Sequence, residues 1–152
     1  MMNIAYLILG HSNPRALKRL LISLTTQNST CFVHIDKKVD FNLELINNIH
    51  NVVVSDQRLS LNWGGYSIVA ATLLLLKKAF ETKHFDRYVL ISGDSYPLKS
   101  TKYIEQFFVR NKKLEFINCV RMPGVGKTLD RFNFYLEYDP RRASITGLLI
   151  SL

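Results

Sequence analysis

The chain has 152 residues, of which 47% are hydrophobic and 21% are charged, and its formal net charge at pH 7 is +8. This length suits one domain with its own hydrophobic core, and the composition excludes an intrinsically disordered protein. The positive charge favours anionic partners such as nucleotides, nucleic acid or an anionic membrane face, although a generally basic surface would carry the same charge.

The amino-terminal residues 1–9 superficially resemble a signal sequence, but they lack a basic first region and a small-residue cleavage site. We therefore interpret them as the first strand of a cytoplasmic protein whose basic surface allows peripheral contact with an anionic membrane face. No apolar run approaches the roughly 20 residues of a membrane span. The two cysteines, Cys31 and Cys119, lie in apolar, strand-like segments, so we expect buried free thiols.

Strands and helices are expected to alternate along the first 117 residues. Asn13 followed by Pro14 marks a helix start, and leucines then recur at helical spacing. The helix over 66–80 is apolar on most sides and ends near Lys77 and Lys78, so we expect it to be buried. The predicted strands are 4–9, 31–35, 52–54, 88–91 and 114–117, and the predicted helices are 14–24, 43–49, 66–80 and 100–108.

This alternation predicts an α/β protein with a mostly parallel sheet flanked by helices. In open sheets of this kind, ligands bind beyond the carboxyl ends of the strands. Past Cys119 the pattern weakens, and the chain stops within the apolar residues 147–152 without a polar tail. This ending indicates a chain that is truncated at its carboxyl terminus.

Three polar side chains follow predicted strands. Asp36 directly follows the predicted strand 31–35, in the segment 34–38. A carboxylate at this place can accept hydrogen bonds from uracil or ribose, and the neighbouring lysines attract phosphate. Asp94 directly follows another strand, where an acid can bind a sugar hydroxyl or a metal. His11 follows the first strand. Taken singly, each has a simpler explanation as a solvated charge cluster, an Asx-turn and a loop histidine, respectively.

The segment Trp63-Gly64-Gly65 stands at the start of the long apolar helix. Paired glycines permit close approach of the backbone to a ligand, and the indole offers a flat face for a sugar or base. A tryptophan that fills the core beside a tight turn is an equally good explanation of this segment by itself.

Several common chemistries find no support in the sequence. No Asp-x-Asp pattern occurs, so the metal clamp of many sugar-nucleotide transferases is absent. Residues 124–128 resemble a phosphate-binding loop, but Arg121 occupies the position where that pattern requires glycine. No Ser/His/Asp or Cys/His nucleophile set is recognisable.

In their order along the chain, these motifs resemble the core-2/I-branching enzyme family. This family comprises branching β-1,6-N-acetylglucosaminyltransferases, peptide xylosyltransferases and bacterial relatives. The resemblance covers residues 3–117 and rests on the segments 4–11, 34–38, 62–67 and 92–100 together with Arg58.

The resemblance implies a GT-A-like, Rossmann-like fold. It also implies inverting transfer of a GlcNAc- or xylose-type sugar from a UDP-sugar to an acceptor glycan hydroxyl, without metal or cofactor, in surface polysaccharide or glycan synthesis. By the same resemblance, Asp36 contacts uridine and Asp94 lies near the donor's sugar or phosphate. The residues that it assigns to donor binding are His11, Asp36, Arg58, Trp63, Gly64, Gly65 and Asp94.

Members of this family are longer than this chain. Inverting transfer needs a general base and positive charge for the leaving diphosphate, and in the family both come from the later half. We therefore interpret residues 1–120 as the nucleotide-sugar-binding half and residues 121–152 as the incomplete start of the acceptor and catalytic half. The general base is expected beyond Leu152, because Glu115 and Glu137 lie in no matching motif.

Two other functions remain open at this point. One is a truncated, non-catalytic nucleotide- or glycan-binding remnant of such an enzyme. The other is a basic α/β nucleic-acid-binding domain, which would require basic residues on one face with exposed aromatics. Because the basic residues are dispersed along the sequence, we expect no nucleic acid as a partner. The partners that the resemblance implies are a UDP-sugar donor and a glycan acceptor.

Overall fold

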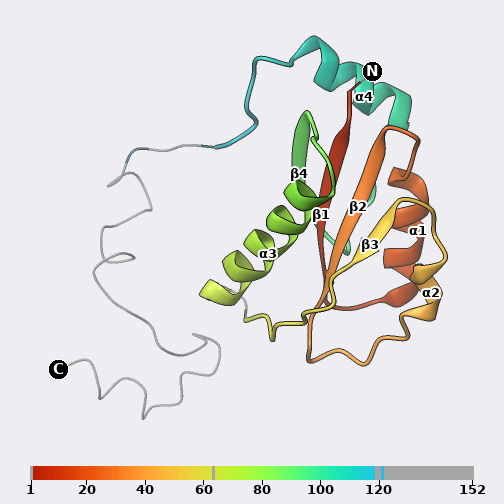
Figure 1. The fold of residues 1–152 in the computed structure, drawn as a ribbon, viewed down its shortest axis with the longest axis vertical. Coiled ribbons are helices and arrows are strands. Elements are labelled where there is room, and N and C mark those ends of the chain that lie inside the picture. Colours follow the sequence, from red (N-terminus) through yellow and green to blue (C-terminus); the bar gives the residue numbers. More distant parts are fainter. Residues whose placement is uncertain (1, 63, 119–120, 122–152) are drawn as a thin grey trace.

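A computed structural model describes residues 2–62, 64–118 and 121. Four strands form one parallel sheet in the order β3-β2-β1-β4 (Figure 1). This arrangement confirms the predicted α/β class. The strands are β1 (Ile4–Gly10), β2 (Ser29–Ile35), β3 (Val52–Val54) and β4 (Arg87–Ser92), and the helices are α1 (Pro14–Leu24), α2 (Glu44–Asn47), α3 (Tyr66–Thr82) and α4 (Thr101–Arg110).

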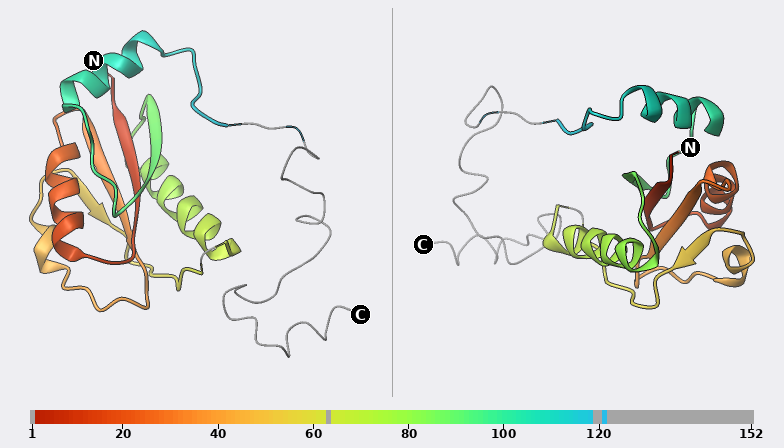
Figure 2. Two further views of the ribbon diagram at one scale, coloured as in Figure 1. Left: turned by 180° about the vertical axis from the view of Figure 1, so that it is seen from behind. Right: turned by 45° about the horizontal axis from the view of Figure 1, so that its top comes forward.

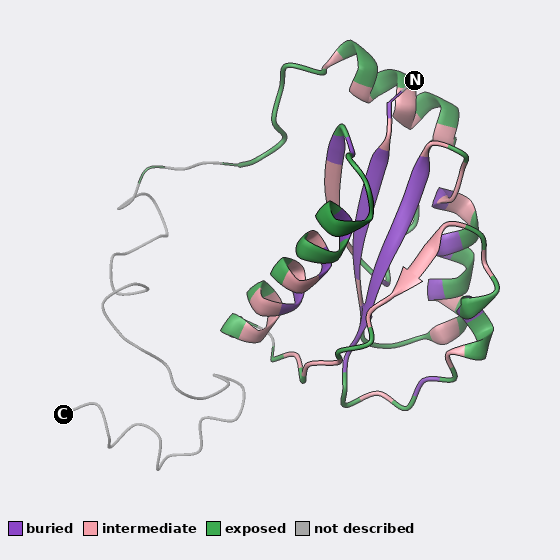
Figure 3. Ribbon diagram, in the orientation of Figure 1, coloured by how far each residue is buried: buried purple, intermediate pink, exposed green. Residues whose placement is uncertain are grey.

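The two central strands are buried on both faces (Figure 3). This burial explains why β1 and β2 read as nearly continuous apolar runs rather than as alternating ones. Alternate residues of β1 serve two separate cores. Ile4, Tyr6 and Ile8 pack with the leucines of α1, whereas Ala5 and Leu7 pack with Leu75 of α3. The two helices therefore cover opposite faces of the sheet (Figure 2).

Helix α1 begins as predicted. The Asn13 side chain accepts hydrogen bonds from the amides of Arg15 (3.0 Å) and Ala16 (3.1 Å), and Pro14 occupies the first helical position. These contacts satisfy two amides that have no partner within the helix. These bonds fix the start of α1 directly after the carboxyl end of β1.

Replacing Asn13 with alanine is expected to lower the free energy of unfolding by about 1 kcal/mol, because both amides lose their acceptor. Asn13→Asp keeps an acceptor at the same place and serves as the matched control. Urea unfolding of the three proteins measures the difference. Equal midpoints for the wild type and Asn13→Ala would contradict this role of the cap.

The predicted strand over 114–117 is wrong. These residues form no strand, and their side chains contact other parts of the chain. The Arg87 guanidinium donates to Glu115 Oε1 (2.9 Å) and to the carbonyl of Asn111 (3.0 Å). Phe116 packs on the rings of Phe107 and Phe108, with centroids 5.2 and 5.9 Å away. Of the apolar residues that suggested a strand, Phe116 therefore packs against α4, whereas Leu114 and Ile117 are exposed.

Helix α3 is longer and less buried than predicted. It continues to Thr82, past Lys77 and Lys78, and its buried residues are Ala71, Leu75 and Ala79. Leu73 and Phe80 are 51% and 63% exposed. One stripe of the helix packs on the sheet, while the opposite apolar side faces outward in the part of the chain that the structure describes. Within that part, no helix is both long and apolar enough to cross a bilayer.

Cys31 is a buried free thiol, as predicted. Burial raises the pKa of its thiol to about 12, so the sulfur stays protonated at neutral pH. Cys119 lies outside the described residues, as do residues 122–152, which contain most of the second predicted half of the chain.

Candidate functional site

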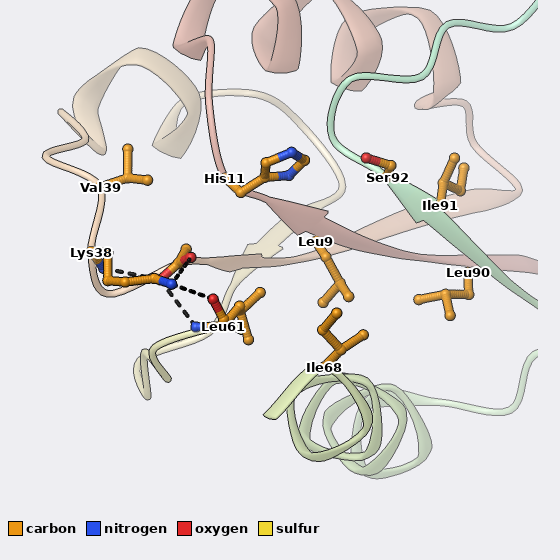
Figure 4. A pocket seen from close by; sticks show the side chains of 10 residues that line it. Leu9, His11, Lys38, Val39, Leu61, Ile68, Leu90, Ile91 and Ser92 are labelled. Carbon is orange, nitrogen blue, oxygen red and sulfur yellow. Dashed lines mark hydrogen bonds and ion pairs between the residues drawn. The ribbon is translucent and has the colours of Figure 1, made fainter. Parts of the chain in front are cut away.

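A pocket of about 770 Å³ opens at the carboxyl ends of β1, β2 and β4, beside the start of α3 (Figure 4). Strands β2 and β3 follow one another on one side of β1, and β4 lies on the other side of β1. The reversal lies between β1 and β4, and such a point is where open α/β sheets bind ligands. The polar residues that line the pocket are His11, Asp36, Lys38 and Ser92.

The ends of β1 and β4 approach each other at two glycines. The Gly93 amide donates to the Leu9 carbonyl (2.8 Å), and a Cβ on Gly93 would lie 3.0 Å from Gly10 Cα. Only a residue without a side chain allows this separation, because both neighbouring atoms belong to the backbone. The close approach brings the residues that follow the two strands next to each other.

His11 and Asp94 meet at this junction. His11 Nε2 lies 3.0 Å from Asp94 Oδ2, and each side chain is 48% exposed. Ser12 Oγ donates to the other carboxylate oxygen, Oδ1. The structure thus joins two residues that are 83 positions apart in the sequence. Contact of this pair with a donor sugar remains a prediction.

Asp36 is 4% exposed and has two distinct carboxylate oxygens. Oδ1 accepts from the amides of Lys38 (2.9 Å) and Leu61 (3.2 Å). Oδ2 lies 3.8 Å from Lys38 Nζ, which also donates to the Asn62 side chain (3.2 Å). Oδ1 therefore has a structural role. Oδ2, with its lysine neighbour, is the oxygen with capacity to accept a hydrogen bond from a ligand.

Arg58 was predicted to bind the donor, and its contacts here are with the protein backbone. Its guanidinium donates to the carbonyls of Ile35 (3.3 Å), Asp36 (2.8 Å) and Val39. These three bonds tie the segment after β3 to the loop after β2. Arg58 thus shapes the pocket wall, and direct contact with a donor remains a prediction.

The glycine pair lies in the turn before α3. Gly64 has a φ of +74°, which favours glycine, and the Gly65 amide donates to the Asn62 carbonyl (2.9 Å). This turn joins two residues of the pocket wall, Leu61 and Ile68. Trp63 lies outside the described residues, so its place in the pocket remains a prediction.

His34 is a residue to which sequence reasoning gave no role. It is fully buried on β2, and its Nε2 accepts a hydrogen bond from the Leu59 amide (2.9 Å). The sequence did carry a signal, since an ionisable residue within a strand that is otherwise buried and mostly apolar needs a specific partner. The partner itself, 25 residues later, could not be identified from the sequence.

The described residues contain no group of three or more His, Cys, Asp or Glu side chains arranged to hold a metal ion. The polar side chains at the pocket offer two kinds of interaction to a ligand. Asp36 and the His11–Asp94 pair offer acceptors, and Lys38 supplies positive charge next to the pocket. Such a set can bind a polar ligand that carries both N–H donors and negative charge.

A family profile described as Core-2/I-Branching enzyme matches residues 4–143. The chain is similar to Xylosyltransferase 2 of Rattus norvegicus (27% identical over 124 residues) and of Homo sapiens (27% over 121). It is also similar to Xylosyltransferase oxt of Drosophila melanogaster (26% over 128).

These alignments cover 75–79% of this chain but 14% of each relative, so the chain spans about one seventh of the length of the curated relatives that it matches. The profile match, in contrast, extends over most of the sequence. The chain belongs to the Core-2/I-branching enzyme family, a family of glycosyltransferases.

Proposed function

We propose that this chain forms the donor-binding part of a glycosyltransferase that moves a sugar from a UDP-sugar to a glycan hydroxyl. The observation that carries the proposal is the pocket at the β1/β4 reversal, where Asp36 is buried with Oδ2 beside Lys38. A carboxylate oxygen in such a place can accept the N3–H of uracil, a ring N–H that adenine and cytosine lack. The names of the xylosyltransferase relatives support a xylose-type sugar, and the resemblance to branching N-acetylglucosaminyltransferases supports a GlcNAc-type sugar as the alternative.

The remaining groups suit the rest of a nucleotide sugar. Lys38 supplies positive charge for a phosphate, and the His11–Asp94 pair at the pocket mouth offers acceptors for sugar hydroxyls. The resemblance to the branching enzymes supports inverting transfer without a metal, and no Asp-x-Asp pattern occurs in this sequence. In that case, protein cations rather than a metal would neutralise the leaving diphosphate.

Inverting transfer also requires a general base, and Glu115 is unsuited to this role. It pairs with Arg87 at the amino end of β4, whereas the pocket opens near Ser92 at the carboxyl end. Five residues of strand separate these ends by about 17 Å. We therefore expect the base outside the described residues.

Calorimetric titration of the purified chain with UDP tests the proposal. We expect binding with a Kd in the range of about 10 µM to 1 mM, as for ordinary enzyme substrates. The affinity should be the same in Mg²⁺ and in EDTA, and ADP should bind much more weakly. A folded chain that binds ADP as well as UDP, or that needs Mg²⁺ for UDP, would contradict the proposal.

A further inference from the structure

His34 lies where an ionisable group is costly. It is fully buried, and along β2 it shares the α3-facing side of the sheet with Phe32. Leu9 is its partner in the register with β1. A charged imidazole would be strongly disfavoured among these apolar side chains, whereas a neutral imidazole with one good hydrogen bond is tolerated.

The hydrogen bond from Leu59 determines how the neutral ring is protonated. The backbone N–H of Leu59 donates to Nε2 over 2.9 Å, so Nε2 must present its lone pair. A neutral imidazole with an unprotonated Nε2 carries its proton on Nδ1. That atom is buried and has no hydrogen-bond partner among the described residues. The ring is thus held in one tautomer by a single backbone contact.

Leu59 belongs to the segment 58–62, which contributes Leu61 to the wall of the pocket. The Leu59 carbonyl accepts from the Lys37 amide (3.0 Å), so its peptide groups are held on both sides. Two residues later, the Leu61 amide donates to Asp36 Oδ1 (3.2 Å), and the Leu61 side chain lines the pocket. The bond from Leu59 to His34 ties this segment to a side chain inside the sheet, and the Arg58 guanidinium adds a bond to the carbonyl of Ile35 at the end of β2.

We propose that His34 is a positioning residue and that, while neutral, it holds the segment 58–62 in the donor-binding arrangement and releases it on protonation. The inference rests on the proposed function, because it assigns a role to a wall of the same pocket. A proton on Nε2 would face the Leu59 N–H with a second donor. The hydrogen bond would be replaced by repulsion, and the half-buried Leu59 amide would lose its acceptor.

The surroundings set the direction of the pH dependence. Burial lowers the pKa of His34, Asp36 acts in the opposite direction, and Arg58 lowers the pKa further. These two are the charged groups that act on the ring, from the loop after β2 and from the segment 58–62. Because the pKa in the folded chain is below the ordinary value of about 6.5, the unfolded chain takes up the proton first. The contribution of His34 to stability is therefore complete above about pH 6.5 and is lost as the pH falls.

Two variants of His34 distinguish its role as a hydrogen-bond acceptor from the effect of its protonation. His34→Gln places an amide oxygen near the position of Nε2, so it keeps an acceptor that does not ionise. His34→Leu keeps an apolar side chain of similar reach but removes the acceptor. Both leave His11, Asp36 and the ligand's own phosphates unchanged, so any difference in pH profile between the variants and the wild type belongs to position 34.

The first measurement is independent of any ligand. Nitrogen-15 NMR of the full chain near pH 7.5 should show His34 as the Nδ1–H tautomer, and the protection factor of the Leu59 amide should fall as the pH is lowered below about 6.5. The protection factor should stay constant in His34→Gln and be low throughout in His34→Leu. An Nε2–H tautomer, or equal Leu59 protection in wild type and His34→Leu, would overturn the proposal.

The second measurement is UDP affinity at about pH 7.5 and pH 4.5. The wild-type Kd should rise about fivefold more than that of His34→Gln, the factor expected for one net hydrogen bond. His34→Leu should bind weakly at both values. Identical pH profiles in wild type and His34→Gln would overturn the coupling to the donor site. If UDP binds to no protein at any pH, the proposed function fails, while the exchange measurement still decides whether His34 holds the segment.

Discussion

Replacing Asp36 with asparagine is expected to weaken UDP binding by about tenfold to a hundredfold, the usual loss for a charged hydrogen bond. The asparagine keeps an oxygen for the amides of Lys38 and Leu61, which Asp36 Oδ1 accepts now. At the position of Oδ2 it presents an N–H₂ group, which cannot accept from uracil. Calorimetric titration gives the affinity, and thermal unfolding checks that the fold is retained.

Two further variants sharpen this prediction. Asp36→Ala removes both oxygens, so it should lose affinity and also lower the free energy of unfolding by about 1–3 kcal/mol, because two part-buried hydrogen bonds to backbone amides are lost. Asp40→Asn changes an exposed carboxylate in the same loop and should bind UDP like the wild type. If Asp36→Asn binds UDP as tightly as Asp40→Asn does, Asp36 does not contact the nucleotide.

Replacing Gly93 with alanine is expected to lower the free energy of unfolding by about 1–3 kcal/mol, the usual cost of overpacking. The new Cβ would lie 3.0 Å from Gly10 Cα and 3.1 Å from the Leu9 carbonyl oxygen. Both atoms are backbone atoms within the sheet, so relief requires β1 and β4 to separate at the pocket. The same movement would pull Asp94 away from His11, so we also expect weaker UDP binding.

Ser95→Ala is the matched control for this substitution, because Ser95 is exposed and adjoins the same turn. It should change the free energy of unfolding by less than about 0.5 kcal/mol. Urea unfolding of Gly93→Ala, Ser95→Ala and the wild type measures the two effects. A Gly93→Ala protein as stable as Ser95→Ala would show that the ends of β1 and β4 are not held as closely as described.

The sequence predicted the sheet well, because the strands are continuous apolar runs with distinct ends. All four strands of the structure were predicted, and Asn13 begins its helix as expected. Ser100, the first residue of the predicted helix 100–108, caps α4 through its side chain. The predicted strand over 114–117 failed for a tertiary reason, since Arg87 and the rings of α4 hold those residues. The burial of α3 was overestimated, because apolar composition does not reveal which faces of a helix find a partner.

The site was predictable only in part. The ends of predicted strands identified His11, Asp36 and Asp94, since parallel strands bring their carboxyl ends to one edge. That His11 pairs with Asp94 depends on the strand order, which places β4 beside β1. The backbone contacts of Arg58 and His34 span 19 to 25 residues, and no local pattern in the sequence indicates them.

The central claim is that UDP binds at the carboxyl ends of β1, β2 and β4. Nitrogen-15 NMR of the labelled chain during titration with UDP tests this claim most directly, because it reports the location of binding residue by residue. We expect the largest amide shift changes in residues 10–12, 36–38, 59–62 and 92–94, and little change in α4 at the opposite edge. Changes concentrated in α4, or no changes at saturating UDP in a folded chain, would contradict the account.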